Sequence, residues 1–200
     1  NNVLAVEIHQ NSATSSDISF ALELLGNEAG DTPQVTRGPY LQQVTASSAI
    51  VRWRTNVPSN SQINFGTTFN NLVTPATDNT VTTEHSITLS GLAPATQYFY
   101  SIGTTTQEIA KSQEQFFKTA PTAGTRTPTR IWVIGDAGWS SQGQRDVYQA
   151  YRTFTGAQYT DLFLLLGDNA YIYGTDYEYQ TGFFDIYPEL LRQTSVWSTL

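Results

Sequence analysis

The sequence predicts a multidomain chain in which an all-β sandwich is followed by the first part of an α/β domain. Between residues 36 and 120, short segments of alternating polar and apolar residues are separated by turn residues, as in an antiparallel sandwich. Beyond residue 130, two continuous apolar runs, 131–134 and 162–166, flank a helical stretch, which is typical of a parallel sheet. Both runs end in Gly-Asp, so these strand ends are where we look for chemistry.

Composition excludes several classes of function. The net charge is −7 and the lysines are confined to Lys111 and Lys118, which argues against binding to nucleic acid or to an anionic membrane. No apolar stretch approaches the roughly 18–20 residues that cross a bilayer. The chain has no cysteine, so a metal would have to bind oxygen or imidazole ligands. Abundant Thr, Ser, Asn and Gln favour an extracellular or periplasmic, secreted protein.

The first residues predict the end of a preceding domain. Because the chain contains no methionine, Asn1 is not expected to be a translation start, and we expect a fragment of a longer protein. Residues 3–9 and 18–24 alternate as strands do, and two strands cannot bury a core by themselves. Residues 1–26 resemble the closing hairpin of a galactose-binding-like jelly-roll module. Residues 27–35, which with Gly26 contain Gly, Asp, Asn and Pro, are expected to be a linker.

The next region, 36–120, predicts the sandwich. Its clearest strands are expected at 49–54, 62–65, 84–89, 98–102 and 114–117. The stretch from Gly91 to Tyr98 has a tyrosine-corner pattern, in which a tyrosine hydroxyl bonds back to the chain, and Trp53 is the expected core plug. With these features the region resembles a fibronectin type III module.

A second linker, 121–129, precedes the incomplete α/β domain, 130–200. The helix expected at about 143–155 carries Val147, Tyr151 and Phe154 at i, i+4, i+7 spacing, which makes a right-handed strand–helix–strand unit with the two apolar runs. Both strands are expected to be buried on both faces in a complete sheet, and the unfinished sheet is expected to leave apolar faces of 131–134 and 162–166 exposed. A second helix is expected at about 176–186, with Phe183, Phe184 and Tyr187 inward and an end at Pro188, and a third strand is approached by Leu200.

The dipeptides Gly135-Asp136 and Gly167-Asp168 follow the two apolar runs. Carboxyl ends of neighbouring parallel strands meet at one edge of a sheet, where ligands bind, so Asp136 and Asp168 are expected side by side. Paired carboxylates repel each other and need protons or cations between them, and oxygen ligands suit Mg, Mn or Fe, with Zn also accommodated. The alternative is that each Gly-Asp is an ordinary turn or helix cap.

The two blocks Gly135-Asp136-Ala137-Gly138 and Gly167-Asp168-Asn169-Ala170-Tyr171 resemble the first metal-binding motifs of calcineurin-like metallophosphoesterases. The tyrosine three residues after the second aspartate, with the sandwich upstream, resembles the purple acid phosphatase branch. That resemblance implies a two-metal centre in which Asp136 binds the first metal, Asp168 bridges both, and Tyr171 binds the first as a phenolate. The metals implied are Fe(III) and a divalent Fe, Zn or Mn. The alternative for Tyr171 is a merely packed aromatic.

The resemblance also implies ligand blocks that the chain lacks: Gly-Asn-His-Glu/Asp, a further lone histidine, and Gly-His-x-His. Its histidines, His9 and His85, are expected to be ordinary half-exposed strand residues. The implied reaction is hydrolysis of phosphomonoesters by the whole protein, and the fragment is expected to bind metal weakly and to be inactive. Two alternatives stay open: a phosphodiesterase or nucleotidase of the same superfamily, and a non-enzymatic extracellular carbohydrate-binding or adhesion protein with a degenerate phosphatase domain. No sequence feature predicts an oligomeric state.

Overall fold

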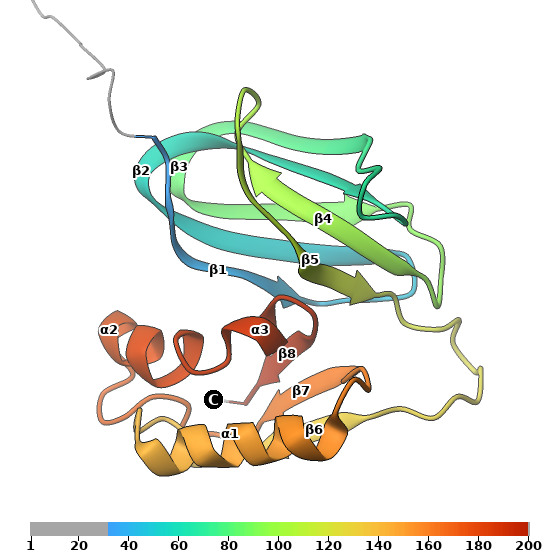
Figure 1. Cartoon of the computed structure of the whole chain (residues 1–200). Helices are drawn as coiled ribbons and strands as arrows, with labels where there is room; N and C mark the ends of the chain where they lie inside the picture. The colour runs from blue at the N-terminus through green and yellow to red at the C-terminus, as the bar shows by residue number, and fades with distance from the viewer. Residues whose placement is uncertain (1–31, 200) are drawn as a thin grey trace, which may run out of the picture. The chain divides into compact units, whose positions relative to one another are not determined.

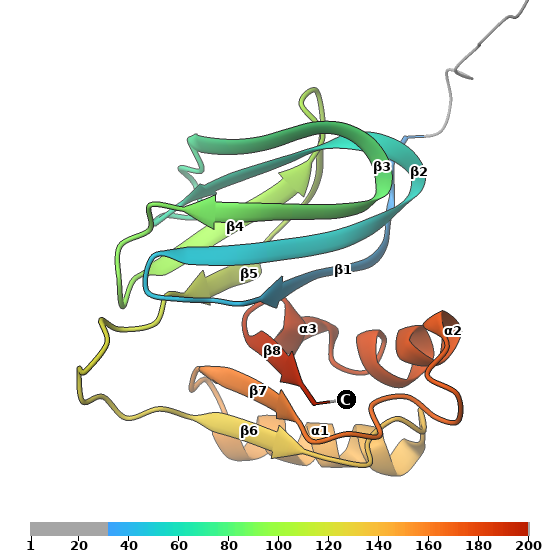
Figure 2. The same ribbon diagram turned by 180° about the vertical axis from the view of Figure 1, so that it is seen from behind.

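The strands of the sandwich are long and cross between its layers. The computed structural model describes residues 32–199, so the hairpin expected at 1–26 and the start of the expected linker lie outside the described residues. Strand β2 pairs with β1 through its first half and with β4 through its second half, so it contributes to both layers (Figures 1 and 2). The sandwich strands are β1 (Val35–Gln42), β2 (Ser48–Gly66), β3 (Thr74–Ser90), β4 (Gln97–Gly103) and β5 (Glu108–Lys118).

Strand β2 joins two segments that the sequence predicted as separate strands, 49–54 and 62–65. Its pairing with β3 shifts register between Arg54 and Ser61, around Pro58. Proline has no N–H to donate to a sheet. At Pro58 the strand therefore continues with an irregularity in its pairing, and no turn forms. The break that we predicted between two strands is therefore an irregularity within one long strand, at the place where β2 passes from one layer to the other.

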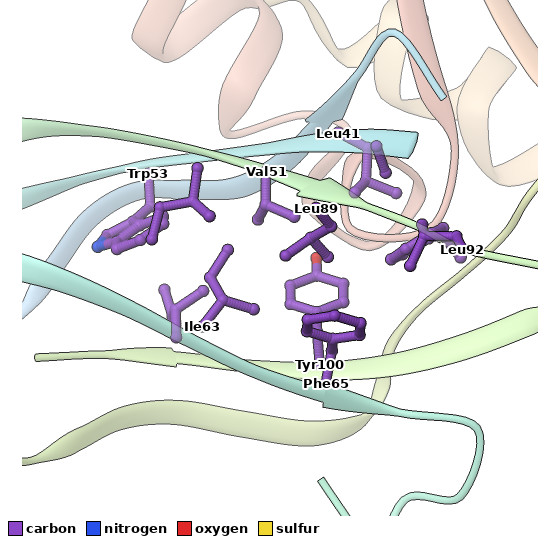
Figure 3. Packing of buried hydrophobic residues seen from close by; sticks show 12 residues of the cluster. Leu41, Val51, Trp53, Ile63, Phe65, Leu89, Leu92 and Tyr100 are labelled. Carbon is purple, nitrogen blue, oxygen red and sulfur yellow. The ribbon is translucent and has the colours of Figure 1, made fainter. Parts of the chain in front are cut away.

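The sandwich core confirms the predicted fibronectin-like fold class. Leu41, Val51, Trp53, Ile63 and Tyr100 are at most 1% exposed and interdigitate between the layers (Figure 3). The hydroxyl of Tyr98 accepts a hydrogen bond of 2.9 Å from the backbone N–H of Ala93, which is the predicted tyrosine corner.

The α/β part contains the predicted strand–helix–strand unit and a third strand. Strands β6 (Ile131–Ile134), β7 (Leu162–Leu165) and β8 (Ser195–Ser198) run parallel in the order β6-β7-β8. Helix α1 (Gln142–Thr155) begins where the Ser141 hydroxyl accepts from the N–H of Gln144.

The inward face of α1 differs from the predicted one. Val147 and Phe154 are 58% and 87% exposed, whereas Tyr148 is buried and Tyr151 stacks on Trp132 with ring centroids 4.2 Å apart. Gln144 is also buried, because its amide donates to the Gly182 carbonyl and the Tyr187 hydroxyl. Aromatic stacking on Trp132 and a satisfied amide decide the rotation of the helix; the apolar spacing identified Tyr151 but missed Tyr148 and Gln144.

The second predicted helix, 176–186, is divided between two short pieces, and a third short helix follows it. The three are α2 (Asp176–Tyr179), the π-helical turn η1 (Gln180–Phe184) and α3 (Pro188–Leu191). Phe183 and Tyr187 are buried as predicted, but Pro188 begins α3 instead of ending a helix. Proline is favoured at the first helical position, because the N–H that it lacks has no helical partner there.

The two parts share one hydrogen-bonded sheet. Strand β1 pairs in parallel with β8 through Leu41 and Ser195, which gives the order β5-β4-β2-β1-β8-β7-β6 (Figure 2). The hydroxyl of Tyr100, in the sandwich core, donates to the carbonyl of Arg192. Among residues 32–199, no helix has the length and apolar character that a membrane crossing requires.

Strands β6 and β7 are covered on one face within the described residues. Trp132, Phe163 and Leu165 belong to one buried cluster with Tyr148 of α1 and Phe183 and Tyr187, but Ile131 and Val133 are 49% and 46% exposed. The exposed apolar faces that we predicted for an unfinished sheet are therefore confirmed, because no element among residues 32–199 covers the second face.

Candidate metal centre

The parallel pairing of β6 and β7 brings the two Gly-Asp dipeptides together. Ile134 pairs with Leu165, and the ladder continues past both strands: the N–H of Leu166 donates to the Ile134 carbonyl (2.8 Å), and that of Asp136 to the Gly167 carbonyl (3.3 Å). Asp136 therefore lies opposite Gly167, and Asp168 follows one residue further along the same edge. The sequence predicted this juxtaposition from the strand–helix–strand pattern and from the Gly-Asp that follows each apolar run.

Both aspartates have a left-handed backbone. Asp136 has φ 54° and Asp168 has φ 51°, while Gly167 between them in space has φ 106°. A non-glycine residue in this region costs of the order of 1 kcal/mol or more, and such residues concentrate at functional sites. The repetition of the same unfavourable turn at two neighbouring strand ends argues against the reading of these dipeptides as unrelated ordinary turns.

The third predicted residue completes the cluster. The Tyr171 hydroxyl lies 2.5 Å from Oδ2 of Asp168 and 3.0 Å from Oδ1 of Asp136. One phenol has one proton, so the two carboxylates compete for a single hydrogen. The hydrogen bond to Asp168, then desolvation, then the bond and charge of Asp136 raise the pKa of Tyr171. Tyr171 is therefore part of the cluster and not a merely packed ring.

The charge of this cluster fits a cation. Within residues 32–199, no Arg, Lys or His forms an ion pair with Asp136 or Asp168. That same range also holds no group of three or more His, Cys, Asp or Glu residues placed to bind a metal. The donors that converge are two carboxylates and a phenol, all of them hard oxygen ligands. They fit part of a hard-metal site, with Tyr171 as the third donor in place of a third carboxylate or imidazole.

Gly138 allows the two site loops to meet. A Cβ on Gly138 would lie 2.5 Å from the Cα of Ala170, and the Gly138 carbonyl accepts from the N–H of Tyr171 at 3.1 Å. A Cβ on Gly182 would lie 2.7 Å from the same carbonyl oxygen. The sequence analysis did not assign this role, although a second glycine three residues after Gly135 was visible in the motif.

Trp139 is a further neighbour that the sequence analysis missed. Its ring stacks on Tyr171 with centroids 4.5 Å apart, and its side chain is 59% exposed. Trp139 and Asp136 also line a cavity of about 310 Å³ beside the cluster, with Ile134, Val147 and Tyr187. An exposed aromatic that covers a site tyrosine could be suspected from sequence only once that tyrosine is assigned.

His85 takes no part in the site. It is 2% exposed, not half-exposed as predicted, and stacks on Trp53 with centroids 4.8 Å apart. The Thr55 hydroxyl donates to the Val57 carbonyl, so its oxygen accepts from Nε2–H of His85, and Nδ1 accepts from Ser61. Burial lowers the pKa of His85, and the neutral ring is fully hydrogen-bonded. His9 lies outside the described residues.

One protein family matches the sandwich part of the chain. Residues 38–119 match the family described as "Purple acid Phosphatase, N-terminal domain". None of the curated proteins matches the chain. The family match covers the sandwich but not the residues of the cluster.

Among solved structures, the one described as "Structure of PhoD" aligns with a TM-score of 0.59 and 15% identity. The alignment covers 84% of this chain and 40% of that one, so this chain spans well under half the length of the PhoD structure. The likeness shows a shared fold that includes both the sandwich and the α/β part. The fn3 domain of human contactin 1 aligns with a TM-score of 0.35 and 17% identity, over 57% of this chain and 99% of that domain.

Proposed function

We propose that the whole protein hydrolyses phosphomonoesters at a two-metal centre, to which this chain contributes Asp136, Asp168 and Tyr171. The convergence of these three oxygens at adjacent strand ends carries the proposal. Asp136 and Tyr171 would hold the first metal, Fe(III), and Asp168 would lie between it and a divalent Fe, Zn or Mn. Secretion to an extracellular or periplasmic location is part of the same proposal.

The chemistry follows from what each residue does. When bound, such a metal pair supplies positive charge to the phosphoryl oxygens and activates water for attack on phosphorus. Asp136 and Asp168 supply the negative charge that holds the cations, and both are exposed, which leaves the phosphate a path of approach. Without a metal, the Tyr171 hydroxyl keeps its proton and donates to the carboxylates; with a cation bound it would release that proton to solvent, and the phenolate oxygen would serve as a metal ligand. No nucleophilic side chain is required.

This chain supplies only part of such a site. Three donors leave the second metal with one bridging carboxylate, so we expect weak metal binding and no turnover of a phosphate ester by the 200-residue chain. Saturable phosphatase activity of the purified chain, destroyed by Asp168→Asn, would contradict this expectation.

The direct test is spectroscopic. On addition of Fe(III), the chain should develop a visible absorption band from charge transfer between a phenolate and iron, and Tyr171→Phe should abolish it. Tyr173→Phe is the matched control: Tyr173 lies two residues away and its side chain is 83% exposed. A band that survives in Tyr171→Phe, or that disappears equally in Tyr173→Phe, would remove Tyr171 from the site.

A further inference from the structure

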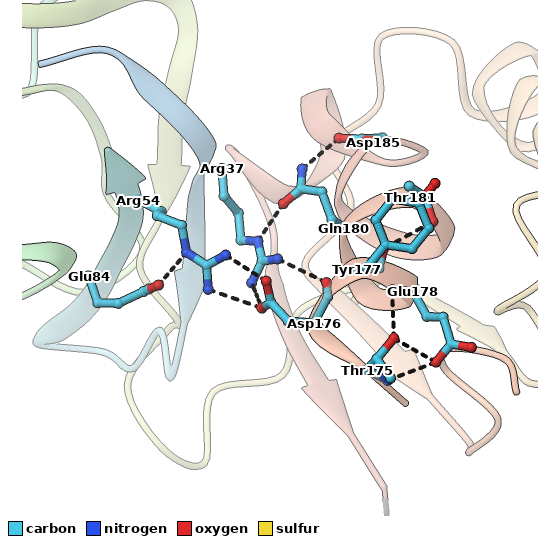
Figure 4. Close-up of polar contacts among 10 residues, drawn as sticks. All are labelled: Arg37, Arg54, Glu84, Thr175, Asp176, Tyr177, Glu178, Gln180, Thr181 and Asp185. Carbon is cyan, nitrogen blue, oxygen red and sulfur yellow. Dashed lines mark hydrogen bonds and ion pairs between the residues drawn. The ribbon is translucent and has the colours of Figure 1, made fainter. Parts of the chain in front are cut away.

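The backbone that directly follows Tyr171 is held by one carboxylate. Glu178 accepts hydrogen bonds from the N–H groups of Ile172 (2.5 Å), Tyr173 (3.1 Å) and Thr175 (2.8 Å), and from the Thr175 hydroxyl (2.9 Å). Capping of helix α2 requires only the contacts between Glu178 and Thr175 (Figure 4). The bonds to residues 172 and 173 go further, and they fix the loop that carries Tyr171.

The same short helix is held from the sandwich. Asp176 receives Nη1 of Arg37 (2.8 Å) and both terminal nitrogens of Arg54 (2.7 and 3.0 Å). Arg37 belongs to β1 and Arg54 to β2, so both guanidinium groups come from the sandwich. These hydrogen bonds, foremost that from Arg54, hold the pKa of Asp176 far below its usual range.

Arg37 is committed entirely to this segment. Its Nη2 donates to the carbonyl of Asp176 (3.2 Å), its Nε to Gln180 (2.6 Å), and its guanidinium lies 4.5 Å from the ring centroid of Phe184. The side chain is only 8% exposed. A buried guanidinium that lost these partners would be left uncompensated, so the contact is firmly maintained. Figure 4 shows Arg37 and Arg54 reaching Asp176 from one side, while Glu178 binds Thr175 on the other.

We propose that the sandwich positions Tyr171 through this chain of contacts: Arg37 and Arg54 fix Asp176, and Glu178, two residues later, fixes the backbone of residues 172–175. The four are positioning residues and touch no metal. The inference rests on the proposed function in one respect, which is that Tyr171 is a metal ligand. It makes the sandwich a structural part of the metal centre and not an independent neighbour.

The first measurement needs no metal. Amide hydrogen exchange of residues 172, 173 and 175 should accelerate about tenfold in Glu178→Gln, since each charge-assisted hydrogen bond contributes on the order of 1.5 kcal/mol or more. Asp176→Asn should accelerate the same amides. Arg54→Gln is the milder variant if Asp176→Asn fails to fold, because Arg54 is 27% exposed and Arg37 keeps its own contacts. Unchanged exchange in all three folded variants would overturn the proposal.

The matched control is Glu114→Gln. It breaks another ion pair between the sandwich and the α/β part, with Arg192 at 3.5 Å, and that pair does not contact the Tyr171 loop. The exchange of amides 172–175 should stay as in the parent chain. If Glu114→Gln accelerates them equally, the effect is general loosening between the two parts and the proposal fails.

The second measurement separates this inference from the proposed function. At equal iron occupancy, the absorption band that depends on Tyr171 should weaken severalfold in Glu178→Gln and Asp176→Asn but not in Glu114→Gln. If the amides loosen but the band keeps its full intensity, the contacts do not position Tyr171 and the inference is wrong. If the parent chain itself shows no band that depends on Tyr171, the proposed function fails, and the exchange results still decide whether the sandwich fixes the loop.

Discussion

The sandwich and the α/β sheet differ in how completely they are covered. The largest side chains between the sandwich layers are almost inaccessible, as Trp53 and Tyr100 show at 1% and 0% exposure. The β6–β7–β8 sheet is packed by α1 on one face, while Leu166 and Trp197 of its region are 56% and 50% exposed. The candidate metal centre thus lies in the α/β part, whose sheet is covered on one face only within residues 32–199, and not in the fully packed sandwich. Its geometry therefore depends on contacts supplied by the sandwich.

The largest effect should come from the covered region. Trp53→Ala removes a ring that is 1% exposed, and we expect a loss of about 3–5 kcal/mol in the free energy of unfolding, because the layers cannot close over the space. Chemical denaturation followed by circular dichroism measures it. Val81→Ala, at a side chain that is 68% exposed, should change stability by less than about 0.5 kcal/mol. Equal losses of unfolding free energy in Trp53→Ala and Val81→Ala would show that burial in the sandwich core does not determine its stability.

A smaller effect is expected where the two site loops touch. Gly138→Ala places a methyl group 2.5 Å from the backbone of Ala170, so the loops must separate at a cost of about 1–3 kcal/mol, with weakened iron binding. Gly143→Ala is the control, because its Cβ would meet only the Ser141 hydroxyl, at 3.9 Å, within α1. That variant should be neutral or slightly stabilising. Tolerance of Gly138→Ala without loss of iron binding would show that the close approach is dispensable.

The pH dependence of the sandwich should be modest. Because burial lowers the pKa of His85, the unfolded chain takes up a proton at a higher pH than the folded protein, near the ordinary value of 6.5. The neutral ring therefore contributes fully to the free energy of unfolding above pH 6.5. That contribution is lost as the pH falls from 6.5 towards the folded-state pKa. The free energy of unfolding, measured between pH 8 and pH 5, should decline less steeply in His85→Phe. Parallel slopes would show that His85 does not titrate differently in the two states.

The smallest effect should come from the uncovered face. Val133→Thr, at a position 46% exposed on β6, should change the free energy of unfolding by no more than about 0.5 kcal/mol and should improve solubility. Phe163→Ala, on the covered face of the adjacent strand at 0% exposure, should cost about 3–5 kcal/mol. A large cost for Val133→Thr would mean that this face is already covered in solution.

The sequence predicts what is local in this fold and misses what joins distant segments. Apolar runs and turn residues located β6, α1 and β7, and the two strand ends placed Asp136 beside Asp168. The ion pair between Arg37 and Asp176 joins residues 139 positions apart, and neither residue stands in a pattern that indicates a partner.

The misses within elements have the same kind of cause. The burial of Gln144 depends on acceptors at residues 182 and 187, and the need for glycine at 138 depends on where Ala170 lies. Such requirements are set by the tertiary neighbour, so they are invisible until the neighbour is placed.

The pairing of β1 with β8 changes what residues 121–129 have to do. In a protein whose domains move separately, the length of the linker limits how far apart they can lie. Here the pairing of β1 with β8 and the Tyr100 hydroxyl already join the sandwich to the α/β part. Extra residues in this stretch would then cost only loop entropy, about 0.6 kcal/mol for each doubling of length. It is the natural place to insert a tag or a cleavage site without disturbing either half.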